Sequence, residues 1–191
     1  MHVVPRPPRL RARFVLIATL VACAAALRLV PHPPNFTPVG GIALFAGAEF
    51  GSLAAALALP LLSMLASDLW MEAIGQPGIH SGMPVVYACF VVAVLLGRWG
   101  ARTGAGRLPP RRIAVLALLS ATLFFVATNF AVWASSRTYP HDLRGLASCY
   151  LAALPFFRNT LAGDAVTVAG LFGALALAER RWPELRRTAS T

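Results

Sequence analysis

The sequence predicts an all-α polytopic membrane protein with six transmembrane helices and both termini in the cytoplasm. Of its 191 residues, 58% are hydrophobic and only 13% are charged, which is typical of integral membrane proteins. All seventeen basic residues are arginines, and they give a net charge of +10. Because they occur in short runs beside apolar segments, they indicate the positive-inside signal of a membrane protein rather than nucleic-acid binding.

Six apolar stretches supply the predicted helices. They run over residues 14–30, 39–50, 51–67, 84–99, 112–135 and 161–179. A membrane span needs about 20 residues, so 39–67 could form one long helix or two short ones. Gly47, Gly51 and Pro60 favour two helices that turn near residues 49–51. The basic start and the first apolar stretch resemble a signal peptide, but an uncleaved first helix suits the topology better.

The arginines test this count of spans. With six spans and an internal N-terminus, thirteen arginines lie inside and four lie outside. The four outside are Arg28, Arg137, Arg144 and Arg158. Five spans would put one arginine cluster on the wrong side of the membrane. We therefore expect one integral domain over 1–191, with a core at 14–179 and basic cytoplasmic tails at 1–13 and 180–191.

A proline-rich segment between the first two apolar stretches is the most informative part of the sequence. Residues 28–47 read RLVPHPPNFTPVGGIALFAG, with four prolines that remove backbone donors and end the preceding helix. Non-helical backbone beside a span persists only where protein or a water-filled cavity satisfies its polar groups. The segment is therefore a candidate binding site on the outer face, with an ordinary loop as the alternative.

Most residues capable of chemistry fall in three predicted outer segments, 28–38, 68–83 and 136–160. Asp68 ends an apolar helix beside Trp70, either as a binding residue or as a solvated helix end. Asp164, near the start of the last span, either complements that helix dipole or serves function with Arg158 as its ion-pair partner.

Metal and catalytic sites have weak support in the sequence. His32, His80 and His141 lack the spacing of ligands on one helix, and three cysteines show no metal-type pattern. No GxSxG, HExxH or Walker motif is present, so we expect no enzyme. In the first helix, Ala18, Ala22 and Ala26 form a small-residue face that could dock a partner membrane protein.

Several strings carry a resemblance to a known class of proteins. They are HPPNFTPVGGIALFAGA, SDLW, GIHSGMPVVYACFVVAVLLGR, TNFAVW and YLAALPFFRNTLAGD, spread over residues 28–172. They resemble a family of small bacterial six-helix membrane proteins. That family is similar to the substrate-binding S-components of energy-coupling-factor (ECF) vitamin transporters, and nearest to the solitary cobalamin-transporting S-components.

The resemblance implies a multi-pass protein of a bacterial inner membrane. It also implies uptake of a vitamin or cofactor-sized ligand, with cobalamin or a related corrinoid favoured, through a pocket on the outer face. The residues that match the pocket of the family are Asn35, Phe36, Asp68, Tyr87, Arg158 and Asn159. The cobalamin-transporting relatives place a cobalt-binding cysteine before the fourth helix. Here that stretch, QPGIHSGMP, has no cysteine, and His80 would be the axial ligand instead.

Two functions from different classes follow. In the first, the chain is a substrate-binding transport protein with no cofactor of its own, whose partners are a small molecule, the lipid bilayer and an energising ECF module. In the second, it is a non-transport scaffold or assembly protein that binds a partner through its outer loops. A membrane enzyme acting on lipids is disfavoured because the acidic residues are few and scattered.

Overall fold

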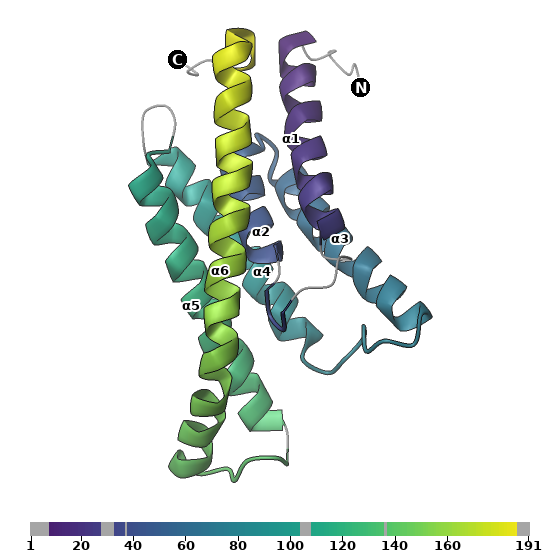
Figure 1. The fold of residues 1–191 in the computed structure, drawn as a ribbon, viewed down its shortest axis with the longest axis vertical. Helices are drawn as coiled ribbons and strands as arrows, with labels where there is room; N and C mark the ends of the chain where they lie inside the picture. Colours follow the sequence, from purple (N-terminus) through teal and green to yellow (C-terminus); the bar gives the residue numbers. More distant parts are fainter. Residues whose placement is uncertain (1–7, 28–32, 37, 104–107, 136, 187–191) are drawn as a thin grey trace.

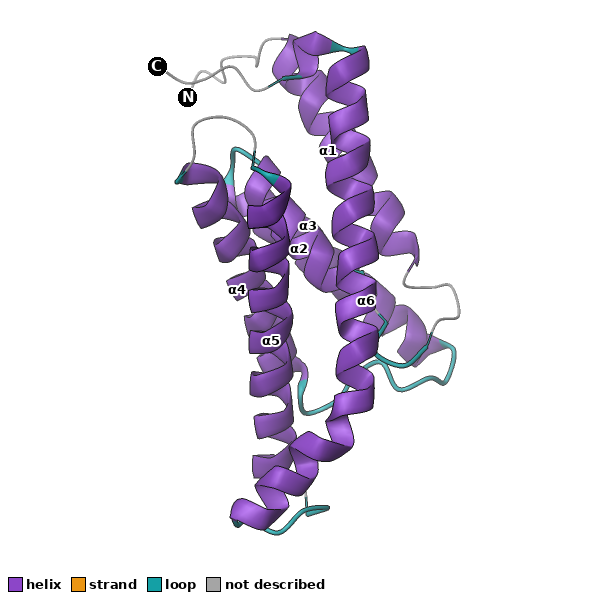
Figure 2. Cartoon of the chain, turned by 60° about the vertical axis from the view of Figure 1, so that its left-hand side comes forward, coloured by secondary structure: helices purple, strands orange, loops and turns teal. Residues whose placement is uncertain are grey.

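The protein is a bundle of antiparallel helices (Figure 1). This computed structural model describes residues 8–27, 33–36, 38–103, 108–135 and 137–186. The helices are α1 (Pro8–Ala26), α2 (Val39–Glu49), α3 (Leu53–Ala73), α4 (Met83–Arg102), α5 (Pro110–Ser135), α6 (Leu143–Arg181) and the short 3-10 helix η2 (Pro183–Leu185). Within the described residues there is no strand, and Figure 2 shows only helices and loops. The predicted all-α class is confirmed.

The chain reverses direction between successive helices, so the start of α1 and the end of α6 lie together (Figure 1). We call this end of the bundle the terminal end. The opposite end, which we call the loop end, carries the connections at 74–82 and 137–142. The arginine distribution predicts that the terminal end is cytoplasmic.

Four helices are long and apolar enough to cross a membrane: α3, α4, α5 and α6. They expose many large apolar side chains, among them Leu62, Leu95, Leu118 and Leu151. A water-soluble protein would cover so large an apolar surface, whereas lipid solvates it. The chain is therefore a membrane protein. Since α1 begins with three arginines in six residues and α2 has only 11 residues, six crossings remain a prediction.

The predicted boundary between the second and third helices is confirmed. The α2 helix ends at Glu49 and α3 begins at Leu53, after Ser52, whose hydroxyl accepts a hydrogen bond from the Ala55 amide at 3.4 Å. Serine at this position satisfies one of the free amides at the start of a helix. The long-helix alternative for residues 39–67 is therefore wrong.

The predicted start of the last helix, at residue 161, is wrong. The α6 helix begins at Leu143, capped by the Asp142 carboxylate, which accepts from the Gly145 amide at 2.7 Å. Pro155 lies inside this helix, where a proline removes one backbone hydrogen bond without ending the helix here. With 39 residues, α6 is about 58 Å long, well beyond the hydrocarbon thickness of a bilayer.

Parts of both predicted tails, 1–13 and 180–191, are helical in the structure. The α1 helix already begins at Pro8 and buries Arg13, while α6 continues to Arg181 and is followed by η2. Residues 1–7 of the first tail and 187–191 of the second lie outside the residues that the structure describes. Of the tail arginines, Arg9, Arg11 and Arg13 thus belong to α1 and Arg180 and Arg181 to α6, and Arg13 is part of the packed interior.

The short α2 helix forms the centre of the bundle. Ten of its 11 residues are buried, and it packs against α4, α3 and α6. Its length is about 16 Å, roughly half the hydrocarbon thickness of a bilayer. Two glycines allow close contact with α4: a Cβ on Gly47 would lie 1.9 Å from the Val94 carbonyl oxygen, and one on Gly97 would lie 2.1 Å from that of Leu44.

A buried ionic cluster holds the terminal end together. The Arg13 guanidinium of α1 donates to Glu49 of α2 at 2.5 Å, to Glu179 of α6 at 2.5 Å and to the Leu185 carbonyl at 2.5 Å. All three residues are less than one-tenth exposed. One guanidinium therefore compensates two carboxylates and joins α1, α2 and α6 where their charges cannot reach bulk water.

Loss of the Arg13 guanidinium should destabilise the protein strongly, because the buried Glu49 carboxylate would lose its cation and Glu179 would lose its bond to α1. We expect Arg13→Ala to lower the free energy of unfolding by about 3–5 kcal/mol. Arg11→Ala is the matched control, since Arg11 is exposed on the same helix and its loss should change stability by less than about 0.5 kcal/mol. Thermal and denaturant unfolding in detergent would measure both, and equal effects would contradict the role of the cluster.

Candidate functional site

A cavity of about 320 Å³ lies on the loop-end side of α2. It lies beyond the first residue of α2, where Asn35 of the turn at 33–36 and His80 of the loop between α3 and α4 line it. Its aromatic lining is Phe90, Phe124, Phe125, Phe156 and Phe157. Its polar lining is Asn35, His80, Thr128, Asn129 and Thr160. A largely apolar cavity with a few polar groups is the usual composition of a small-molecule site.

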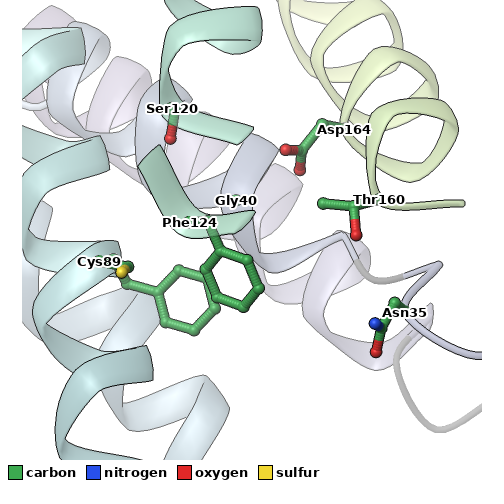
Figure 3. A pocket seen from close by; sticks show the side chains of 8 residues that line it. Asn35, Gly40, Cys89, Ser120, Phe124, Thr160 and Asp164 are labelled. Carbon is green, nitrogen blue, oxygen red and sulfur yellow. The ribbon is translucent and has the colours of Figure 1, made fainter. Parts of the chain in front are cut away.

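A smaller compartment of about 50 Å³ adjoins this cavity. We call the two spaces the outer and the inner compartment. Both are lined by Asn35, Phe90, Phe124 and Thr160, and the rings of Phe90 and Phe124 stack with centroids 5.7 Å apart. The inner compartment adds Gly40, Cys89, Ser120 and Asp164 (Figure 3). One water occupies about 10–15 Å³ on this measure, so the inner compartment accepts a group of only a few heavy atoms.

The proline-rich segment supplies a tight turn above the inner compartment. The Phe36 amide donates to the Pro33 carbonyl at 3.0 Å, and Asn35 has a positive φ of 61°. Proline at the second position and asparagine with positive φ at the third are the features of a type II turn. The Asn159 amide of α6 donates to the Pro34 carbonyl at 2.9 Å. Sequence positions 125 apart are thus held together beside the cavity.

The loop between α3 and α4 brings His80 to the outer compartment. The Glu72 carboxylate accepts from the Gly78 and Ile79 amides at 3.2 and 3.1 Å. A Cβ on Gly78 would lie 1.9 Å from the Asp68 carbonyl oxygen, so glycine is needed for the loop to approach α3. His80 Nδ1 accepts from the Gly82 amide at 3.2 Å. In a neutral imidazole this arrangement puts the proton on Nε2, which is then a donor and not a metal ligand.

Asp164 closes the bottom of the inner compartment. Its Oδ1 accepts from the Gly41 amide at 2.9 Å, and the side chain is only 5% exposed. The Gly41 amide belongs to the first turn of α2, where amides have no partner within their own helix. Gly40 makes room, because a Cβ there would lie 2.5 Å from Oδ1. Asp164 therefore caps α2 rather than its own helix. Figure 3 shows its carboxyl group directed toward Gly40 at the start of α2.

The described residues provide no cation for Asp164. The ion pairs between two described residues join Arg13 to Glu49 and to Glu179, and neither involves Asp164. The predicted Arg158–Asp164 pair does not form: Arg158 is exposed, while Asp164 is buried six positions along the same helix, on a different face.

A groove of about 750 Å³ between α5 and α6 lies on the other side of Asp164. Its lining is mainly apolar, with Ile113 and Ala117 on α5 and Val168 and Phe172 on α6. It extends along α6 as far as Arg180 near the terminal end. Asp164 is the one described residue that lines both this groove and the inner compartment.

The residues predicted to bind a ligand fall into different places. Asn35 and His80 line the cavity, and Asn159 holds the turn that contains Asn35 and Phe36. The described lining includes neither Asp68 nor Tyr87: the Tyr87 hydroxyl and Asp68 Oδ2 hydrogen-bond at 3.2 Å, linking α3 to α4. Arg158 is exposed and outside the described lining.

The five phenylalanines that line the cavity were missed by sequence reasoning, which named Phe36 and Tyr87 as the aromatic pocket residues. A usable signal was present in α6, where Phe156, Thr160 and Asp164 recur every four residues and so share one helix face. In α5, Phe124 and Thr128 show the same spacing. Polar residues repeated on one face of a span mark the face that lines a cavity.

Two other predicted sites are the histidine metal site and the alanine face of the first helix. Within the described residues no three His, Cys, Asp or Glu side chains come together as a metal site, and His32 lies outside those residues. On α1, Ala18 is half-buried against the core, whereas Ala22 and Ala26 are exposed. Docking of a partner helix on this alanine face stays a prediction.

Comparison with known proteins gives one match. Residues 8–185 match DUF6580, a family of unknown function. No curated protein and no solved structure matches the chain.

The turn above the inner compartment should depend on the positive φ of Asn35. We expect Asn35→Val to lower the free energy of unfolding by about 1–2 kcal/mol, because a β-branched residue is strained in the left-handed region. Asn35→Gly should keep both the turn and most of the stability. Melting temperatures in detergent would compare the two variants. If valine and glycine gave the same stability, the turn would not have this conformation.

Proposed function

The chain belongs to DUF6580, a family of unknown function, and we propose that it is a membrane transport protein that binds a vitamin-sized ligand at its loop end. The observation that carries the proposal is the aromatic cavity of about 320 Å³ above α2, which continues into a compartment ending at Asp164. Cavities of this size and lining suit small organic ligands. The positive-inside rule favours an orientation with the loop end outside the cell, and a binding site at that end supports uptake as the direction.

The groove between α5 and α6 supports transport over binding alone. A transporter needs a binding site that can open to either side of the membrane, with a boundary that separates the two sides. Asp164 lines the inner compartment from one side and the groove from the other, so a small movement of α5 relative to α6 would join them. The release path that we propose therefore runs from Asp164 along α6 toward Arg180.

The dimensions favour a ligand smaller than a corrinoid. A corrin macrocycle with its nucleotide side chain is far larger than the drug-sized molecules that fill cavities near 300 Å³. His80 with its proton on Nε2 is also poorly prepared to bind cobalt. We retain the transport class implied by the likeness to ECF S-components and replace cobalamin with a smaller ligand. An energising ECF module stays part of the proposal, since the chain has no ATPase motif.

The alternative, a scaffold or assembly protein, has its support in the same groove. An open apolar groove with small residues such as Ala117 and Gly173 would accept the helix of a partner protein. A scaffold would have no use for the compartment below Phe90 and Phe124. Ligand binding therefore separates the two functions.

Filling the outer compartment should abolish ligand binding. Ala153 lines it, and its neighbour Ala152 is exposed on the outside of α6. We expect Ala153→Trp to weaken binding and uptake at least tenfold, and Ala152→Trp to leave both unchanged. The measurement is a melting-temperature screen against thiamine, riboflavin, biotin and cobalamin, followed by uptake of any hit into a strain that lacks its own transporter.

Two outcomes of this screen would contradict the proposal, in whole or in part. If no vitamin in the panel raised the melting temperature and none was taken up, the transport proposal would fail in favour of the scaffold. If cobalamin were the compound bound, with Ala153→Trp abolishing its binding, our choice of a smaller ligand would be wrong while transport stood.

A further inference from the structure

Among the residues described, the two compartments contain one carboxyl group, that of Asp164, and no arginine or lysine side chain. Asp164 is the only acidic or basic side chain among the described residues that line the inner compartment. In the outer compartment the one ionisable group of the described lining is His80, held as a hydrogen-bond acceptor through Nδ1. An anion entering this space would meet an uncompensated carboxylate, whereas a cation would be attracted to it.

The carboxylate has bonding capacity left for a ligand. Its hydrogen bond with Gly41 uses one acceptor position of Oδ1, and an ionised carboxylate offers about four positions in total. Asp164 is 95% buried (5% exposed), so water from outside satisfies little of the remainder. Thr160, one turn earlier on α6, donates its hydroxyl to the Phe156 carbonyl at 3.3 Å and can still accept. Figure 3 shows both side chains facing the inner compartment.

Aromatic rings surround the route to this carboxylate. Phe90 and Phe124 line both compartments, and Phe125 and Phe157 pack with ring centroids 4.5 Å apart in the outer one. The faces of such rings attract cations, and more strongly where water is excluded. They also offer flat apolar surface for a planar ligand body.

From these observations we infer that the site takes a cationic ligand: a primary amine or amidine on a flat apolar body. The cationic head enters the inner compartment and donates to Asp164, with Thr160 and Asn35 as further acceptors. The apolar body stays in the outer compartment among the phenylalanines. The inner compartment, at about 50 Å³, admits the head and excludes the body. This inference rests on the proposed ligand-binding function and adds the chemical class of the ligand.

A purely structural role for Asp164 is the competing explanation, since the carboxylate also caps α2. The variant Asp164→Asn separates the two roles. Its amide oxygen can still accept from the Gly41 amide, so the cap is retained, while the charge that attracts a cation is lost. A structural role would leave ligand binding in this variant unchanged.

The test compares two probes of the same shape, 2-phenylethylamine and 2-phenylethanol, on the purified full-length protein in detergent. We expect saturable binding of the amine by calorimetry and at least tenfold weaker binding of the alcohol. We expect Asp164→Asn to lose at least tenfold in affinity for the amine, with its ligand-free melting temperature reporting on the fold. Phe124→Leu should weaken the amine by a smaller factor. Ala152→Trp is the control that should bind like the unaltered protein.

Three outcomes would overturn the inference: equal affinity for amine and alcohol, no saturable binding of the amine, or an unchanged affinity in Asp164→Asn. Repeating the titrations with and without Na⁺ tests a fourth outcome. Binding that required Na⁺ and did not depend on the amine group would indicate that the carboxylate binds a metal cation instead. A vitamin that bound the unaltered and the Asp164→Asn protein equally well would overturn the cationic class and leave the proposed transport function standing.

Discussion

The burial of a half-length helix is the constraint on which the rest of the structure depends. Ten of the 11 residues of α2 lie inside the bundle, so neither end of this helix can rely on bulk water for its backbone groups. At the first end, Asp164 of α6 accepts from the Gly41 amide. At the last end, Glu49 is neutralised by Arg13, which also binds Glu179. Side chains from α1 and α6 therefore fix the depth of α2. The Asp164 carboxyl group suits the helix dipole at the amino end, and the Arg13 cation offsets the unfavourable Glu49 carboxylate at the other end.

The same constraint creates the candidate site. Because α2 is only about 16 Å long, the bundle has no second helix at the loop-end level, and the space is left to the turn at Pro33–Phe36 and to the phenylalanines of α4, α5 and α6. Binding in such a space is familiar from transporters whose interrupted helices end at the substrate. The carboxylate that stabilises α2 is also the group that a ligand would reach. Stability and recognition are thus linked through Asp164.

The sequence predicted the class and most helices because hydropathy, glycine and arginine patterns act locally. It indicated the break at Gly51 and the proline turn, although Pro31, His32 and Thr37 of that segment lie outside the described residues. It misplaced the start of α6, since Pro155 and Arg158 suggested a loop that the capping by Asp142 overrides. Which helix Asp164 caps depends on a contact across 123 positions, and no local pattern reveals it. For the same reason Asp68 and Tyr87 were assigned to a ligand when they bond to each other.

The most direct test of this account is whether the space above α2 is open to water from outside the cell. In a variant with Cys23, Cys89 and Cys149 replaced by alanine, a membrane-impermeant maleimide would be applied to intact cells carrying Thr128→Cys or Val126→Cys. Thr128 lines the cavity, while Val126, two residues earlier on α5, is exposed on the outside of the bundle. We predict labelling at Thr128→Cys and none at Val126→Cys. An unlabelled Thr128→Cys, or one labelled only from the cytoplasmic side of inverted vesicles, would contradict the account.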